Sequence, residues 1–162
     1  MRGVRTVFLL VGLFLSACAT PPIDLSGSDP SLTPDQAAAD VASARNRRVA
    51  WGGVIVSVHN LKDETEMEVL GYPLDRDARP DTSAPPQHRF LMVRPGYLES
   101  ADYRNGRMVS ATGAVTGLRE GRVGDATYFY PVLQTDQLYL WSAYEGRRGP
   151  DVHFGIGVIF GR

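Results

Sequence analysis

The chain has 162 residues, of which 43% are hydrophobic and 22% are charged, and its formal net charge is −1 at pH 7. This length is sufficient for one modest hydrophobic core and too short for two. The slightly negative charge argues against a general nucleic-acid binder, because binding to phosphates depends mainly on Lys and Arg.

The N-terminus has the pattern of a bacterial lipoprotein signal peptide. Arg2 and Arg5 precede an apolar stretch over residues 7–15, which ends in the tetrapeptide Leu15-Ser16-Ala17-Cys18. A positive start, a short apolar stretch and small residues before a cleavage point are typical of such signals. The apolar stretch is too short to span a bilayer, which needs about 20 residues. We therefore predict cleavage between Ala17 and Cys18, removal of residues 1–17, and lipidation of Cys18.

Cys18 is the only cysteine of the chain. Lipidation would leave no thiol for a disulfide, so the fold must be stabilised by burial alone. Removal of residues 1–17 would take away two arginines and no acid, which changes the formal charge from −1 to −3. Ala19 follows the cysteine where an aspartate would favour retention in the inner membrane. In the sorting convention of enteric bacteria, an alanine at this position favours transfer of the lipoprotein to the outer membrane.

Residues 18–34 are rich in Pro, Ser, Asp and Gly, and we expect them to form a flexible lipidated tether. The folded domain is expected over residues 35–145. Within Thr33-Pro34-Asp35-Gln36, the threonine is a candidate N-cap, followed by a proline at the first helical position and a glutamine three residues after the cap. This pattern predicts a short helix that continues to Ala44.

After Arg48, the residue pattern becomes typical of β-strands. Residues 49–58 are mostly apolar and β-branched, and Gly52-Gly53 within them suits a strand that coils sharply. Residues 59–63 are predicted to form a hairpin connection. In the next strand, apolar and small residues at 65, 67 and 69 alternate with three glutamates, which predicts one buried face and one solvated face.

The second half is predicted to contain three more strands separated by loops and turns. The expected ranges, in chain order, are a surface loop at 79–87, a strand at 90–93, one turn of helix at 98–103, a strand at 107–118, a turn at Glu120-Gly121-Arg122, and a ribbon at 127–141 with a break near Thr135 and Asp136. The small residues of the 107–118 strand allow a neighbouring backbone to approach closely.

Five strands with a short helix and tightly bent first and fourth strands predict an all-β, OB-like five-stranded barrel. A generic antiparallel sandwich is the alternative. Residues 146–162 are expected to form a separate C-terminal segment. Its part from Val152 to Phe160 alternates in hydrophobicity, so it could add an edge strand or remain a peripheral tail.

The sequence offers little local evidence of catalysis. His59, His88 and His153 are the only histidines, and none stands at metal-ligand spacing from another histidine or a cysteine. There is no Gly-x-Ser-x-Gly elbow, and lipidation would consume the only thiol. We therefore expect no catalytic residue, no cofactor and no metal site, and a protein that is not an enzyme.

Two other groups of residues invite a functional interpretation. Asp75, Asp77, Asp81 and Asp102 could gather around a calcium ion or a basic partner, but their spacing is not that of a calcium loop. We expect turn-forming roles for them instead. Exposed aromatic residues on the second and third strands could stack on bases or sugars. We expect most of the aromatic residues to fill or cap the core, and the ones considered are Trp51, Tyr72, Tyr97, Tyr103, Tyr128, Tyr130, Tyr139 and Trp141.

Several short motifs together resemble the Slp family of Gram-negative outer-membrane lipoproteins. They are Trp51-Gly52-Gly53 with Ile55, Pro73-Leu74-Asp75, Arg79-Pro80-Asp81, Gly96-Tyr97-Leu98, Asp102-Tyr103-Arg104, Gly113 with Gly117, and Tyr130 with Leu140-Trp141. The resemblance covers residues 48–141 and agrees with the predicted lipidation. It implies an outer-membrane lipoprotein that faces the periplasm, is associated with starvation or stress, and has no established catalytic activity.

These observations lead to three hypotheses about function. The first is a non-enzymatic structural or interaction module of the envelope, anchored to the outer membrane by lipid, whose partner is an envelope protein or peptidoglycan. The second is a periplasmic binder of a small ligand or glycan that uses a barrel face. The third is an oligonucleotide-binding OB domain, against which the negative charge and the extracytoplasmic address both argue; we expect no nucleic-acid partner.

Overall fold

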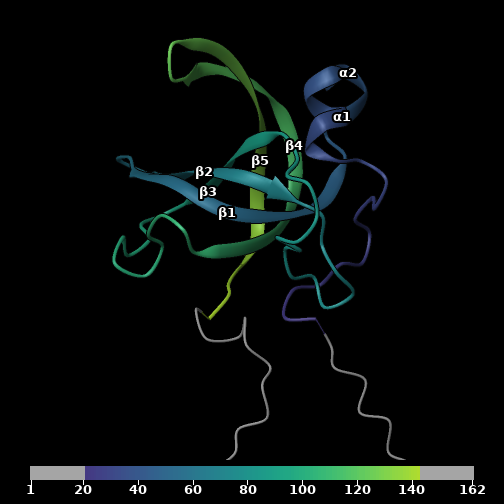
Figure 1. Cartoon of the computed structure of the whole chain (residues 1–162), viewed down its shortest axis with the longest axis horizontal. Coiled ribbons are helices and arrows are strands. Elements are labelled where there is room, and N and C mark those ends of the chain that lie inside the picture. Colours follow the sequence, from purple (N-terminus) through teal and green to yellow (C-terminus); the bar gives the residue numbers. More distant parts are fainter. Residues whose placement is uncertain (1–20, 143–162) are drawn as a thin grey trace, which may run out of the picture.

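The computed structural model describes residues 21–142, which form a five-stranded barrel preceded by two short helices (Figure 1). The strands are hydrogen-bonded in the closed order β1-β2-β3-β5-β4, and every pair is antiparallel except β3 with β5. This confirms the predicted barrel and excludes the sandwich. The elements are α1 (Pro34–Ala39), α2 (Val41–Ala44), β1 (Arg48–Asn60), β2 (Glu64–Tyr72), β3 (Arg89–Pro95), β4 (Met108–Val123) and β5 (Ala126–Leu140).

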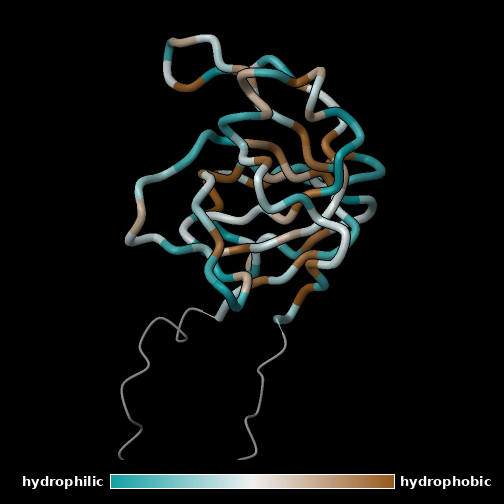
Figure 2. Tube along the Cα trace, turned by 90° about the vertical axis from the view of Figure 1, so that its right-hand side faces the viewer, coloured by the Kyte–Doolittle hydropathy of each residue, from teal (hydrophilic) through white to brown (hydrophobic). Residues whose placement is uncertain are grey.

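The barrel interior is filled by apolar side chains from all five strands. Figure 2 shows the hydrophobic segments gathered inside the body of the molecule. The largest fully buried apolar side chains are Phe90, Ile55, Met67, Met92, Leu133, Val49, Val69, Val109 and Val115. Trp51 packs edge-on against Phe90, with ring centroids 5.2 Å apart. In β2, residues 65, 67 and 69 are fully buried while the three glutamates lie on the other face, as the alternation predicts.

Bulges bend the strands around this core. Thr112 pairs with Gln137 and the next residue, Gly113, pairs with Thr135, so Asp136 has no partner in the ladder. The predicted break near Thr135 and Asp136 is therefore a β-bulge in β5. An extra residue of this kind bends a strand and increases its twist, which is what closure of a small barrel requires.

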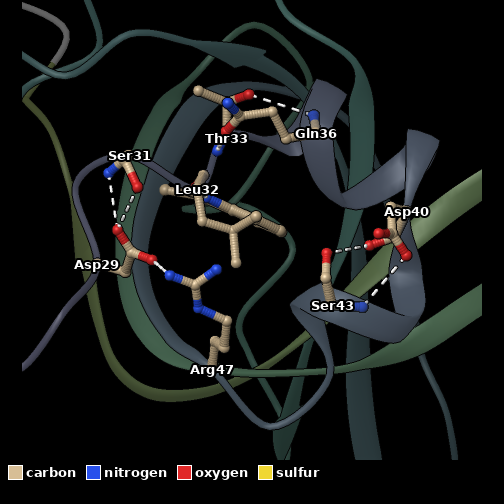
Figure 3. A network of polar contacts seen from close by, with 9 residues as sticks. Asp29, Ser31, Leu32, Thr33, Gln36, Asp40, Ser43 and Arg47 are labelled. Atoms are coloured by element: carbon tan, nitrogen blue, oxygen red, sulfur yellow. Dashed lines mark hydrogen bonds and ion pairs between the residues drawn. The ribbon is translucent and has the colours of Figure 1, made fainter.

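The predicted N-cap is confirmed, but the predicted helix is divided. Thr33 Oγ1 accepts a hydrogen bond from the Gln36 amide at 3.3 Å, and Gln36 Oε1 accepts one from the Thr33 amide at 2.8 Å. At Asp40 the backbone leaves the helical region, and the Asp40 carboxylate accepts the Ser43 amide at 3.2 Å, which starts α2 (Figure 3). An aspartate side chain that bonds nearby amides competes with helix continuation.

One local prediction in the second half is wrong in position, and another is confirmed only in part. The strand β4 runs through Glu120-Gly121-Arg122 to Val123, and the hairpin turn is Gly124-Asp125, where Gly124 has a φ of 58°. Gly121 is a packing residue, because a Cβ there would lie 2.9 Å from the ring of Tyr130. Residues 98–103 form no named helix but contain one isolated helix-like turn, in which the Glu99 carbonyl accepts the amides of Asp102 and Tyr103 at 3.0 and 3.1 Å.

The segment of residues 21–34 differs most from expectation. Its predicted role was that of a flexible tether, yet Ile23 and Leu32 are only 4% and 6% exposed. The Trp51 indole donates a hydrogen bond to the Leu32 carbonyl at 2.7 Å, and the Asp29 amide donates one to the Arg48 carbonyl at 2.8 Å. These contacts hold the segment along the barrel. We call residues 21–34 the docked segment. The C-terminal segment 146–162 lies outside the described residues.

The close approach of β4 and β5 gives the first testable prediction. A Cβ at Gly113 would lie 2.0 Å from the Gln134 carbonyl oxygen, whereas one at Gly117 would meet only the far end of Arg45 at 3.4 Å. We expect Gly113→Ala to lower the free energy of unfolding by about 3 kcal/mol or more, at the upper end of overpacking effects. The matched variant Gly117→Ala should unfold close to the parent in urea. Equal stability of the two variants would contradict the role given to Gly113.

Candidate functional site

A groove lies between the docked segment and the barrel, where the segment passes the start of β1 and the end of β2. Its volume is about 360 Å³, within the range of small-molecule sites. The apolar part of its wall consists of Leu25, Pro30, Leu32, Pro34, Ala50, Trp51, Tyr72, Pro73 and Leu74. Leu32 and Trp51 are joined by the indole hydrogen bond, so the wall is built by the same contact that docks the segment.

The polar groups that line this groove differ in whether they already have hydrogen-bond partners. Asp29 accepts the Ser31 amide at 2.9 Å and the Ser31 hydroxyl at 2.7 Å, and it forms an ion pair with Arg47 (Figure 3). Asp75 accepts the amides of Asp77 and Arg79 at 2.9 and 3.0 Å. By contrast, the Ser28 hydroxyl is buried and has no hydrogen-bond partner among residues 21–142. A buried hydroxyl without a partner is costly, so a ligand that bonds to it would gain free energy.

The outer face of β2 and β3 is the second candidate surface, and the long β4–β5 hairpin covers much of it. Glu66 forms an ion pair with Arg119 of β4, and Glu68 is bound by Arg89 at 2.7 Å and by the Tyr130 hydroxyl at 3.3 Å. The side chains of these two glutamates are only 17% and 18% exposed. The expected solvated face is therefore largely an ion-paired contact between β2, β3 and the hairpin.

An apolar cluster completes this contact. Tyr130 packs with Leu91, Val93 and Val132 on the outer side of the barrel. Burial raises the pKa of the Tyr130 hydroxyl above its usual value of 10.0, and the negative charge of Glu68 adds to this effect. The face on which stacking aromatic residues were considered is therefore occupied by the chain's own hairpin.

The expectation that aromatic residues fill or cap the core is confirmed for Trp51, which belongs to the barrel core. Tyr130 and Trp141 are also buried, Tyr130 in the outer cluster. Two aromatic side chains are instead strongly exposed: Tyr97, which follows β3, and Phe129 of β5. Tyr128 stacks on His88 with ring centroids 4.5 Å apart, at the edge of the covered face. None of these places an open aromatic platform on the described outer face of β2 and β3.

The structure does not bring the other residues singled out from the sequence together into one site among the described residues. Ala17, Cys18, Ala19 and His153 lie outside the described residues. Across residues 21–142, no three His, Cys, Asp or Glu side chains are grouped so that they could hold a metal ion.

The four aspartates considered for a cation lie in two loops. Asp75 and Asp81 stabilise turns, since Asp81 accepts the Ser83 amide at 3.0 Å and the Ser83 hydroxyl at 2.5 Å. These bonds lower the pKa of Asp81. Asp102 lies in the β3–β4 connection, where its amide donates to the Glu99 carbonyl at 3.0 Å. The turn-forming role expected of Asp75 is confirmed.

Sequence reasoning missed the groove, because its wall comes from segments that are far apart in the chain. The pattern at Leu25, Leu32 and Trp51 contained a signal, since isolated leucines in a polar stretch indicate burial against another element.

In the described part of the chain, each helix is too short to cross a membrane.

Comparison with known proteins gives a family over most of the chain. Residues 15–156 match the outer membrane lipoprotein Slp family. The uncharacterized lipoprotein YeaY of Escherichia coli is 35% identical over 133 residues, which cover 80% of this chain and 67% of YeaY. The outer membrane protein Slp of the same organism is 27% identical over 145 residues, covering 86% of this chain and 75% of that protein. An uncharacterized protein of Haemophilus influenzae is 28% identical, covering 88% and 79%.

Among solved structures, a small single-stranded DNA-binding protein from Streptomyces coelicolor aligns with 59% of this chain and 94% of its own. The identity is 11% and the TM-score is 0.37. A likeness this distant carries no inference about what this chain binds.

Tyr130 gives a prediction for the covered face. Because its pKa is raised in the folded protein, the folded state keeps the phenol proton where the unfolded chain loses it. The free energy of unfolding should therefore fall as the pH rises above about 10. We expect Tyr130→Phe to cost about 0.5–1.5 kcal/mol at pH 7, through the lost hydrogen bonds, and to show a shallower fall between pH 9 and 11.

Urea unfolding at several pH values measures both effects. The control is Tyr97→Phe, whose ring is 68% exposed and which should change the free energy of unfolding at pH 7 by less than about 0.5 kcal/mol. An alkaline fall of the same steepness in the parent and in Tyr130→Phe would remove Tyr130 as its source.

Proposed function

Because the chain belongs to the outer membrane lipoprotein Slp family, we propose that lipid on Cys18 holds it on the periplasmic side of the outer membrane, where it acts as a non-enzymatic structural or interaction module. The observation that carries this proposal is the start of the family match. The match begins at residue 15, the first residue of the Leu15-Ser16-Ala17-Cys18 tetrapeptide, so the predicted lipidation site falls inside the matched region.

Three further observations support parts of the proposal. The names of the matched family and of its two Escherichia coli relatives describe lipoproteins and outer membrane proteins, and none states a reaction. Ala19, next to the lipidated cysteine, suits transfer to the outer membrane. The proposed association with starvation or stress rests on the resemblance of the core motifs to the Slp family, and the partner is proposed to be an envelope protein or peptidoglycan.

The anchor gives a direct test. In cells fed radiolabelled palmitate, we expect the parent chain to incorporate label and to sediment with the outer membrane. Cys18→Ser should incorporate none, because the thiol that carries the lipid is absent. Label in Cys18→Ser equal to that in the parent would refute lipidation at this position.

The matched control for sorting is Ala19→Asp, which keeps the cysteine. We expect this variant to incorporate palmitate as the parent does and to fractionate with the inner membrane. If it instead remained in the outer membrane fraction, the residue after Cys18 would not be the sorting signal.

A second candidate function is supported by the groove. The β2–β3 face, on which ligand binding was considered, is covered by the β4–β5 hairpin, whereas the groove under the docked segment is open and mostly apolar. Its free hydroxyl at Ser28 is a polar group suited to orienting a ligand. These features favour a small, mostly apolar molecule with one polar group over a glycan, which needs many polar contacts.

Laurate is a suitable probe of this groove. We expect a saturable rise in the melting temperature of the Cys18→Ser chain, equivalent to about 2.7 kcal/mol at a ligand concentration 100 times Kd. Ala50→Leu should abolish the rise by filling the groove, since Ala50 forms part of its wall. Ala126→Leu, at the exposed start of β5, is the control and should respond like the parent. A rise of the same size in Ala50→Leu would place any laurate elsewhere.

A further inference from the structure

The docked segment is attached to the barrel almost from its first described residue. Ile23 is buried, and the Asp24 amide donates a hydrogen bond to Gln137 Oε1 of β5 at 2.8 Å. The Asp29 amide donates one to the Arg48 carbonyl of β1. The buried Leu32 then receives the Trp51 hydrogen bond. The segment therefore crosses two strands and is fixed at both of its ends. It does not act as a free spacer between the anchor and the barrel.

The covalent distance from the lipid to this attachment is short. Cys18 precedes Pro21 by three residues, and an extended chain covers at most about 3.6 Å per residue. The backbone of the lipidated cysteine therefore lies within about 11 Å of Pro21. A flexible tether of 17 residues, as the sequence suggested, would have allowed several times this reach.

One end of the barrel carries this attachment point, and we call it the anchor end. In Figures 1 and 2, the first and last described residues lie on the same side of the barrel, opposite the tip of the β4–β5 hairpin. The loop between β2 and β3 also lies there, because Leu74 and Asp75 line the groove together with Leu25.

Side-chain contacts hold this loop in place at the anchor end. Ser110 Oγ donates to the Ala78 carbonyl at 2.6 Å and accepts the Trp141 indole at 2.9 Å. The guanidinium of Arg79 lies 5.1 Å above the Trp141 ring. The loop and the end of β5 are therefore parts of one rigid surface.

We propose that the anchor end docks on the phospholipid bilayer that holds the protein's own lipid, and that the β4–β5 hairpin points away from the membrane. The inference rests on the proposed lipidation of Cys18. Charge attraction does not bring this end to lipid, since the formal charge of −3 without residues 1–17 opposes approach to an anionic surface. The short covalent link overcomes this opposition, because it keeps the barrel at the surface whatever its own affinity for lipid.

This orientation determines what the protein presents to the periplasm. The far end consists of the hairpin, with its turn at Gly124-Asp125 and the exposed Phe129 close by. The groove, in contrast, reaches the anchor end, where Leu25, Leu74 and Asp75 line it. In the proposed orientation, the nearest apolar molecules are the lipids of the bilayer.

Depth-dependent fluorescence quenching tests the orientation in the lipidated full-length protein. Lipidation consumes the only cysteine, so a single introduced cysteine can be labelled with an environment-sensitive fluorophore. Arg76→Cys places the label on the exposed part of the anchor-end loop, and Asp125→Cys places it at the hairpin tip. In vesicles of phosphatidylethanolamine and phosphatidylglycerol with headgroup-labelled quencher lipid, we expect quenching to be several-fold stronger at position 76 than at position 125.

The matched control lengthens the link without touching the barrel. Twenty Gly-Ser residues inserted between Thr20 and Pro21 give a coil with an end-to-end distance of about 25 Å, and should lower quenching at position 76 to the level at 125. Equal quenching at both positions without the insertion would overturn the orientation. Strong quenching at 76 that persists with the insertion would overturn the short link as its cause.

The failure of this inference can be told apart from that of the proposed function. A chain that takes up no palmitate and does not float with vesicles refutes both. A chain that takes up palmitate and floats, yet shows equal quenching at the two positions, refutes only the orientation.

Discussion

The hydrogen bond from the Trp51 indole to the Leu32 carbonyl connects three features of this protein that otherwise look unrelated. Trp51 belongs to the barrel core through its edge-on contact with Phe90, so its position is determined by the packing of β1 and β3. The indole N–H needs an acceptor when it is buried, and the docked segment supplies one. The same contact forms part of the wall of the groove and holds the segment that follows the proposed lipidation site against the barrel.

The β4–β5 hairpin makes a second, independent contact with the body of the barrel. Its ion pair from Arg119 to Glu66 involves a partly exposed arginine, and such a pair contributes at most about 1 kcal/mol. Most of the stabilisation therefore comes from burial of Tyr130 against Leu91, Val93 and Val132. The Arg119–Glu66 ion pair helps to determine where the hairpin lies, because Glu66 displaced from this arginine would remain largely covered and without its counter-charge. A ligand for this face would have to displace the hairpin first.

The sequence predicts well those parts of the fold that depend on neighbouring residues. The alternation in β2 and the capping box at Thr33 are signals read within a few positions, and the structure confirms both. The turn at Glu120-Gly121-Arg122 was misplaced because Gly121 makes room for the ring of Tyr130, nine residues later in the chain. This contact exists only once the hairpin has formed. The docked segment was missed for a similar reason, since its polar composition resembles a linker until Trp51 is placed beside it. Cys18 can be read only from the sequence, whereas the groove is visible only in the structure.

The docked segment has a thermodynamic implication for how the protein works. Fixing the backbone of a residue costs about 1–2 kcal/mol in conformational entropy, and a polar linker ordinarily avoids this cost by remaining mobile. Here the cost is offset by burial of Ile23, Leu32 and Pro34 and by hydrogen bonds to β1 and β5. A chain that orders such a segment loses reach and gains a defined position relative to the proposed lipid anchor at Cys18. Such an arrangement suits a partner or ligand met at the membrane surface, and it is poorly suited to contacts deep in the periplasm.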